Sequence, residues 1–295
     1  MKCPGEAPRH ASAAMSKAVG AALFVFFLSV RSLSVAAETR PSVSDFLGQV
    51  QATYDKMQSY SSVGETTLDL FTPAMGSQKS HYTFSIKLAR PNLYRIEWEQ
   101  HSPYMNTSGA AWSAGAGNFI SVPGQKPMQP KDMTTALSMA TGLSGRAAAT
   151  IPSIFFDLSF NSLKSFNSLK GLDAAFGPDA DIEGDPCYVI TGKTKTSGVT
   201  IWISRKSKLL RQIRNDLSAP PKVPDMTDEQ AKSVIQSMGQ TPTAEAIKSM
   251  KEQMNAMRAM SSGMTGSMIQ VQQKIVVNAA LSKADFAPQA PPAGQ

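Results

Sequence analysis

The chain has 295 residues, of which 42% are hydrophobic and 17% are charged, and its net charge is +7. This length and composition suffice for one large domain with an apolar core, and they exclude a polytopic membrane protein and a wholly disordered chain. The net charge falls to +4 when residues 1–37 are set aside, and no run of five basic residues occurs. Nucleic acid is therefore not an expected partner.

The first 37 residues have the organisation of an export signal. Three basic residues, a short apolar run and a small-residue motif follow one another: Lys2, Arg9 and Lys17, then residues 18–30, then Val35-Ala36-Ala37. This order is typical of a secretory signal, cleaved here after Ala37. An uncleaved N-terminal anchor is the alternative interpretation, and Met15 is an alternative start. We expect a periplasmic product with no stable membrane anchor after cleavage.

Residues 42–57 are predicted to form the first helix after this signal. Ser42 and Asp45 have the spacing of a capping box, in which side chains satisfy free N–H groups at a helix start. Apolar residues recur three or four positions apart and share one helical face: Val43, Phe46, Leu47, Val50, Tyr54 and Met57. Such a face must cover another apolar surface.

The hydrophobic period then changes to two, which indicates β-strands. Residues 81–88 and 94–99 alternate between apolar and polar side chains around the turn signal Arg90-Pro91-Asn92, and they predict an antiparallel hairpin. Further strands are expected at residues 61–71, 111–113, 118–122, 187–191, 199–204, 209–214 and 268–278. In the last of these strands one apolar face is expected, formed by Ile269, Val271, Ile275 and Val277.

Helices are predicted in the middle of the chain and in an insertion before the last strand. The segments are residues 132–143, 151–160, 227–238 and 241–261. The last two belong to a Met-rich insertion at about residues 219–266, and they begin with caps at Thr227 and Thr241. The tail, residues 287–295, contains three prolines and is expected to be disordered.

Antiparallel strands interrupted by helices indicate an α+β fold. We count about 9–11 strands, and each needs cover on one face only. The predicted helices supply that cover. An open antiparallel half-barrel over residues 38–286 therefore fits better than a β-sandwich, which would not need the helices.

Residues suited to catalysis or metal binding are sparse. Beyond residue 37 the chain has two histidines, His81 and His101, and one cysteine, Cys187. The histidines fit exposed strand ends, and Cys187 fits a buried strand, so we predict neither an enzyme nor a cofactor, and no intramolecular disulfide. A calcium site is the less favoured interpretation of four alternating acidic residues, Asp179, Asp181, Glu183 and Asp185.

Methionine is unusually frequent, with six of 16 residues between Met250 and Met268. Ile247, Met250, Met254 and Met257 have the spacing of one helical face, which favours ordinary packing. An adaptable lipid-contacting surface and a Cu(I) site remain alternatives, because thioethers are flexible and are soft ligands.

The order of these segments resembles the LolA-like periplasmic superfamily, which includes the outer-membrane lipoprotein carrier and RseB, and most closely an uncharacterised branch of predicted periplasmic proteins. The match spans most of residues 43–288 outside the insertion, and each motif is degenerate, so their order carries the resemblance. The family's Trp-Ile-Asp strand end has Ser204 in place of the acid. The matching segments are Tyr60–Leu70, Arg90–Glu97, Gly184–Ile190, Val199–Ser204, Leu209–Gln212 and Phe286–Pro288.

The resemblance implies an open half-barrel whose concave face is apolar, covered by helices, and able to take acyl chains. We therefore expect a non-enzymatic carrier or chaperone that binds a lipid or the acyl chains of a lipoprotein, with residues 132–160 as the lid. The expected lipid-binding residues are Tyr82, Phe84, Ile86, Leu88, Ile96, Trp98, Ile154 and Phe155.

Two other functions remain open. The same residues would equally form the closed core of a protein-interaction or envelope-signalling module, in which residues 226–266 dock an envelope protein. A periplasmic Cu(I) binder is the third interpretation, and it is favoured least of the three.

Overall fold

The structure is a computed structural model, and it describes residues 40–74, 76–102, 106–158, 173–193, 198–218 and 225–287. Residues 41–295 form one compact unit of the chain. The signal expected at residues 1–37 and most of the tail expected at residues 287–295 lie outside the described residues. No helix within the described residues has the length and apolar character needed to cross a membrane.

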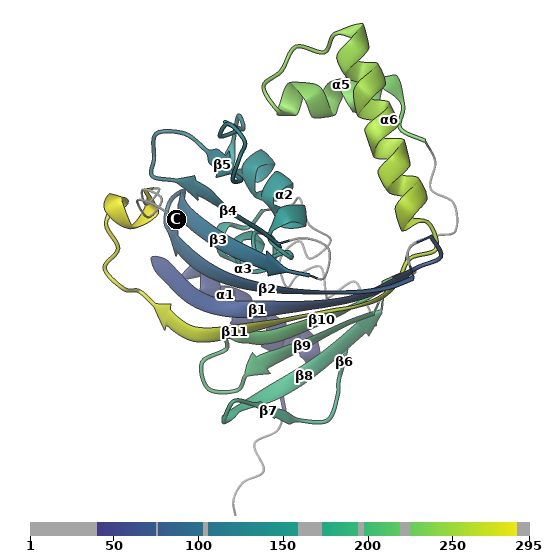
Figure 1. Cartoon of the computed structure of the whole chain (residues 1–295). Coiled ribbons are helices and arrows are strands. Elements are labelled where there is room, and N and C mark those ends of the chain that lie inside the picture. The colour runs from purple at the N-terminus through teal and green to yellow at the C-terminus, as the bar shows by residue number, and fades with distance from the viewer. Residues whose placement is uncertain are drawn as a thin grey trace, which may run out of the picture. The chain divides into compact units, whose positions relative to one another are not determined.

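In the part of the chain that the structure describes, eleven strands form one open antiparallel sheet (Figure 1). Its order is β5-β4-β3-β2-β1-β11-β10-β9-β8-β6, with β7 paired to β8. The first six strands are β1 (Ser59–Thr72), β2 (Gly76–Ala89), β3 (Leu93–His101), β4 (Asn106–Ser113), β5 (Phe119–Ser121) and β6 (Ala175–Phe176). The others are β7 (Ala180–Ile182), β8 (Asp185–Lys193), β9 (Gly198–Ser204), β10 (Leu210–Ser218) and β11 (Thr265–Val277). The predicted α+β half-barrel is confirmed.

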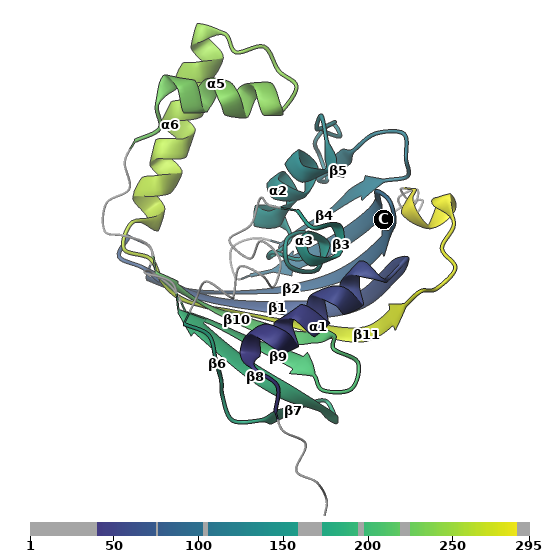
Figure 2. The ribbon, with the colours of Figure 1, turned by 180° about the vertical axis from the view of Figure 1, so that it is seen from behind.

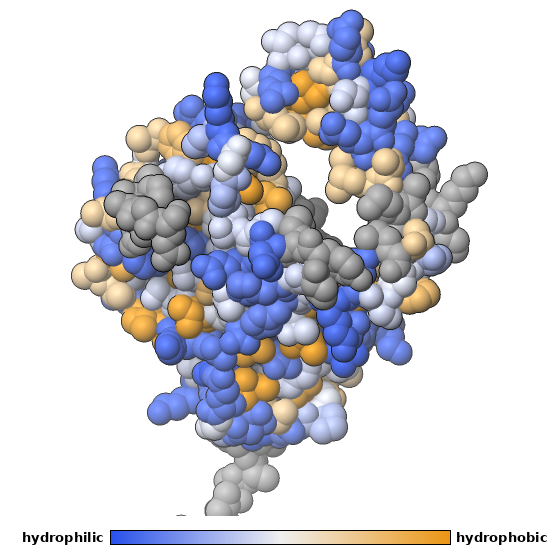
Figure 3. Space-filling view, viewed as in Figure 1, coloured by the Kyte–Doolittle hydropathy of each residue, from blue (hydrophilic) through white to orange (hydrophobic). Residues whose placement is uncertain are grey.

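Within the described residues, five α-helices and one 3-10 turn accompany the sheet: α1 (Val43–Asp55), α2 (Met133–Leu143), α3 (Thr150–Phe156), α5 (Asp228–Ser237), α6 (Ala244–Ser261) and η1 (Lys283–Phe286). Helices α1 and α3 lie behind the sheet in Figure 1 and in front of it in Figure 2. We call this side the helix face and the other side the outer face. Hydrophilic residues predominate in the view of Figure 3, where hydrophobic ones appear as small separate groups.

Helix α1 forms as its sequence predicts. The Ser42 hydroxyl accepts a hydrogen bond from the backbone N–H of Asp45 and donates one to its carboxylate, which satisfies the helix start. Its predicted apolar face is buried in the core except for the half-buried Val43. This face covers β8–β10, where Phe46 meets Tyr188 edge-on and the hydroxyl of Tyr54 accepts a hydrogen bond from the N–H of Leu210.

The hairpin of β2 and β3 also forms as predicted. Phe84 pairs with Trp98 and Ile86 pairs with Ile96 across the two strands. Directly opposed residues of antiparallel strands point to the same side of a sheet. The apolar set of both strands therefore faces the helices, and the polar set faces outward.

Strand β11 forms, but its predicted apolar face does not exist. Lys274 has a positive φ of 47° at the point where the pairing with β1 shifts by one residue, which is a β-bulge. The extra residue reverses the alternation. Ile269 and Val271 point to the outer face, whereas Ile275 lies beyond the bulge and packs against the core.

The start of α6 also differs from the prediction. The helix begins at Ala244, and the hydroxyl of Thr243, not of Thr241, accepts a hydrogen bond from the N–H of Ala246. In α5 the predicted cap is confirmed, since Thr227 and Gln230 form a complete capping box. Helices α5 and α6 lie between β10 and β11 in the sequence and contact each other.

Candidate functional site

The eight residues expected to bind lipid lie together between the sheet and the helices. Four come from β2, two from β3 and two from α3, and none exposes more than 6% of its surface: Tyr82, Phe84, Ile86, Leu88, Ile96, Trp98, Ile154 and Phe155. All except Tyr82 belong to the main core cluster. The structure thus brings them into one apolar layer, and their role as lipid contacts stays a prediction.

Large rings in this layer lie over glycines. A Cβ atom on Gly64 would come within 2.3 Å of the Phe84 ring, and one on Gly109 would come within 2.4 Å of the Trp98 ring. Since both distances are far below van der Waals contact, only glycine fits beneath these rings. Phe84 and Trp98 therefore lie flat over the neighbouring strands and smooth the helix face of β1–β4.

The cover over this layer has a part with small side chains and a part with large ones. We call residues 133–156, which comprise α2, α3 and their connection, the lid. In α2 and the connection most of the fully buried residues are alanines, whereas α3 buries Ile151, Ile154 and Phe155. The alanines are Ala136, Ala140, Ala147, Ala148 and Ala149. At Gly145, which has a φ of 56°, a Cβ atom would come within 2.6 Å of the Tyr82 ring. The lid therefore lies directly on the aromatic layer, and its large inserted groups come mainly from α3.

Arg90 ties the lid to the rest of the molecule. Its Nε atom donates to the carbonyl of Met57 (2.9 Å), and its Nη2 atom donates to the carbonyls of Tyr54 (3.3 Å) and Phe155 (2.8 Å). The guanidinium also lies 4.7 Å from the centre of the Phe155 ring. One side chain of the β2–β3 turn thus holds the ends of both α1 and α3.

A polar band crosses the middle of the helix face, and the sequence prediction missed it. Ser62 and Thr66 of β1 and Gln270 and Gln272 of β11 are each at least 95% buried. They face the helices because Gly64 pairs with both Phe84 and Gln272. The available signal was the alternation of Gln270 and Gln272 between the apolar residues Ile269 and Val271.

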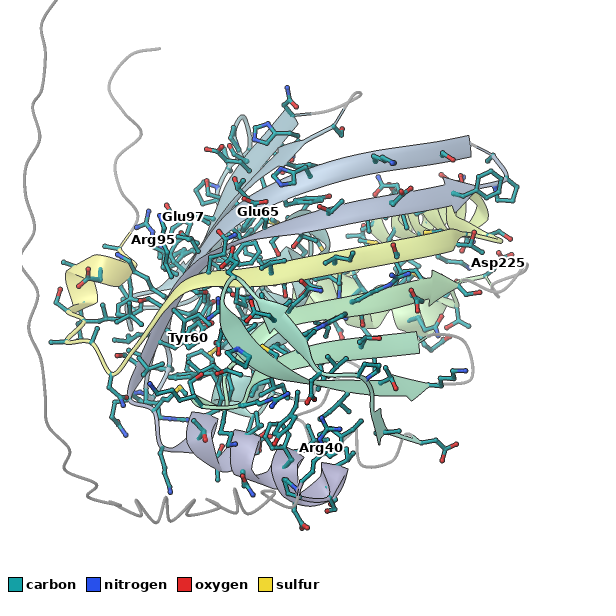
Figure 4. The ribbon with its side chains drawn as sticks, turned by 90° about the horizontal axis from the view of Figure 1, so that it is seen from below. Arg40, Tyr60, Glu65, Arg95, Glu97 and Asp225 are labelled. Atoms are coloured by element: carbon teal, nitrogen blue, oxygen red, sulfur yellow. The ribbon has the colours of Figure 1, made fainter. Side chains whose placement is uncertain are left out.

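The outer face has a separate open groove of about 1060 Å³ along β1–β5. Its lining includes Glu65, Arg95, Glu97 and Trp112. Figure 4 shows Arg95 and Glu97 side by side, and Arg95 donates hydrogen bonds to Glu97 (2.6 Å) and to the carbonyl of Ala287. This hydrogen bond lowers the pKa of the Glu97 carboxyl. The lining combines these charged groups, which disfavour hydrocarbon, with the aromatic residues Phe84, Trp98 and Trp112.

The sequence candidates for chemistry have ordinary partners. Burial raises the pKa of the Cys187 thiol to about 11, which favours the protonated thiol at neutral pH. Arg211 pairs with Glu183 and Asp185, and Arg205 pairs with Asp179. The arginines form ion pairs with the same carboxylates that would have to bind a calcium ion. Within the described residues, no group of three or more His, Cys, Asp or Glu side chains is placed to hold a metal ion.

The four residues predicted to share one face of α6 differ in their exposure to solvent. Ile247, Met250 and Met254 are half-buried, whereas Met257 is 60% exposed. A lipid-contacting surface and a Cu(I) site at these residues both stay predictions.

No protein-family model and no curated protein sequence matches this chain. Solved structures found to be similar include a DUF1329 family protein from Desulfovibrio piger, at 11% identity and a TM-score of 0.31, covering 83% of this chain and 95% of that one. A LolA superfamily protein from Nitrosomonas europaea is similar at 10% identity and a TM-score of 0.31, covering 84% and 99% of the two chains. An outer membrane lipoprotein-sorting protein domain from Vibrio parahaemolyticus is similar at 10% identity and a TM-score of 0.29, covering 81% and 94%.

The open antiparallel sheet with helices on one face is the architecture that the sequence resemblance implied.

Proposed function

We propose that this protein is a periplasmic, non-enzymatic carrier that binds a lipid or the acyl chains of a lipoprotein on the helix face, beneath the lid. The observation that carries the proposal is the contrast between the two layers. The sheet contributes large apolar side chains such as Phe84 and Trp98, while α2 and its connection to α3 bury mainly alanines. This part of the lid leaves the sheet with little loss of packing, because small groups fill little of the space between the layers.

The energies of opening and binding are of similar size. Arg90 makes three hydrogen bonds that hold the lid and α1, and because Arg90 is half-buried each contributes about 1 kcal/mol. A methylene buried against the exposed floor contributes about 0.8 kcal/mol. About four methylenes therefore offset the hydrogen bonds of Arg90, and a longer acyl chain favours the open, loaded state.

The near-complete burial of the eight residues expected to bind lipid favours a second candidate function. A core that stays filled suits an envelope-signalling or protein-interaction module, with the α5–α6 insertion as the docking element. The carrier requires the lid to move, whereas the module requires it to stay.

Energy transfer from tryptophan to a dansylated fatty acid tests the carrier. Trp98 lies on the helix face, and Trp202 lies on the outer face of β9, since Trp202 pairs with Gln212 and Val189, away from Ile201 and Ile203. If the probe binds beneath the lid, Trp98→Phe removes most of the transfer and Trp202→Phe removes little.

Two outcomes would contradict the carrier. Absence of transfer, together with no lipid in organic extracts of the purified protein, favours the module. Loss of transfer in Trp112→Phe but not in Trp98→Phe places the probe in the outer groove instead.

N-terminal sequencing of the periplasmic fraction tests the export signal, with Glu38 expected as the first residue.

A further inference from the structure

The polar band on the helix face leaves hydrogen-bonding atoms without partners. The hydroxyl of Ser62 donates to Oε1 of Gln272 at 2.9 Å, and Nε2 of Gln270 donates to the hydroxyl of Thr66 at 3.4 Å. The other amide atom of each glutamine, Oε1 of Gln270 and Nε2 of Gln272, is buried and has no partner among the described residues. A buried amide atom without a partner destabilises the fold, since it has lost water and gained nothing.

A third amide group extends the band onto the next strand. Asn215 of β10 pairs with Met268 of β11, so it lies on the same face and one pair away from Gln270. Its Nδ2 atom is also buried without a partner in the described part of the chain. Three amide side chains on two adjacent strands thus offer both N–H donors and a carbonyl acceptor, toward the covered side of the sheet.

Apolar residues flank the band on both sides. Toward the lid lies the floor of β2 and β3, which includes Phe84 and Ile86. On the other side, β8, β9 and β10 contribute the buried residues Ile190, Ile201 and Ile213. These three are directly opposed across the strands, and Ile213 is also opposed to Gln270, so they share its face. The helix face is therefore apolar, then polar, then apolar across its width.

We propose that the ligand is a two-chain amphiphile with a diacylglyceryl group, whose ester carbonyls hydrogen-bond to the amide N–H groups of Gln272 and Asn215 while its chains lie on the two apolar flanks. This inference rests on the proposed carrier function and names the ligand class. An ester carbonyl accepts the unused donors, and a hydroxyl or amide N–H near the ester satisfies Oε1 of Gln270. A plain hydrocarbon chain would leave all three amides unpaired.

The test compares an ester with an ether of the same length. Dioctanoyl phosphatidylglycerol has the carbonyls, and its dioctyl ether analogue lacks them while keeping the chains and headgroup. We expect the protein to bind the ester about tenfold more tightly, because the ether leaves the buried donors unpaired. The same comparison of ester with ether is made on a diacylglyceryl-cysteine peptide. If the phospholipid ester binds more tightly than the peptide ester, the ligand is a phospholipid, and if the peptide ester binds more tightly, the ligand is a lipoprotein.

Variants locate the preference. Gln272→Met and Asn215→Leu remove the two unpaired N–H donors and keep side chains of similar size, and we expect the double variant to bind ester and ether equally. Gln212→Met is the matched control, because Gln212 lies on the outer face of β10 opposite Val271, and it should keep the preference. Gln272→Met also removes the acceptor of the Ser62 hydroxyl, which lowers stability, so thermal unfolding of each variant verifies that the fold is kept.

The outcomes separate the two proposals. Equal binding of ester and ether by the wild-type protein, or an unchanged preference in the double variant, overturns the role of the polar band and leaves the carrier standing. Failure of the protein to bind either probe overturns both proposals.

Discussion

Removal of the Arg90 guanidinium tests how the lid is held. Arg90→Met keeps most of the side-chain length and deletes the donors to the carbonyls of Met57, Tyr54 and Phe155. Because Arg90 is half-buried and water reaches part of the site, each lost hydrogen bond costs about 1 kcal/mol. We expect a loss of about 3 kcal/mol in unfolding free energy, or about 6–12 °C in melting temperature for a chain of this size.

Denaturant unfolding with hydrogen exchange measures this effect. Amides of α3 should exchange faster in Arg90→Met than in the wild-type protein, while those of the β8–β9 pair should not change. Arg214→Met is the control, since Arg214 is exposed on the outer face and, among the described residues, is paired with Asp216 alone. This contact contributes at most about 1 kcal/mol. Equal losses of stability in the two variants would refute the claim that Arg90 holds the lid.

Three further predictions concern the core. Gly64→Ala should lower the free energy of unfolding by about 3 kcal/mol, because its Cβ atom would meet Phe84 and the Val271 carbonyl. Gly48→Ala in α1, where the space around the Cβ atom is open, should raise it by about 0.5–1 kcal/mol. Denaturant unfolding measures both changes, and equal stabilities of the two variants would contradict the packing argument. Cys187 should resist iodoacetamide at pH 8 in the folded protein and react on unfolding, as peptide mass spectrometry would show. Burial raises the pKa of Tyr54 and Tyr94 above their ordinary value of 10.0, so the unfolded state loses phenolic protons first, and unfolding free energy should fall as pH rises past 10 but stay level between pH 6 and 8.

Local patterns determined the elements of this protein. The Ser42 cap and the apolar period of 3.6 specify α1, and the alternation around Arg90-Pro91-Asn92 specifies the β2–β3 hairpin. Both signals act within a few residues of chain, so they can be read without knowing the partner surface. The same alternation placed Phe84 and Trp98 on one face, which was the basis for nominating them as lipid contacts.

Long-range pairing decided what the local pattern could not. The bulge at Lys274 reverses the alternation within β11, and it depends on the register with β1, a strand about 200 residues earlier in the sequence. As a result the apolar pair Ile269 and Val271 faces outward, and the glutamines Gln270 and Gln272 face the helices.

The lid likewise depends on tertiary structure. The sequence places helices at about the right residues, but it does not explain the alanines. The structure does, because Gly145 lies directly over the ring of Tyr82 and leaves little space for larger side chains nearby. The sequence therefore determined which segments are helix and strand, because those choices are local. The register of the strands and the face that each strand buries are decided only when distant strands pair. This pairing placed the polar band on the helix face of the sheet.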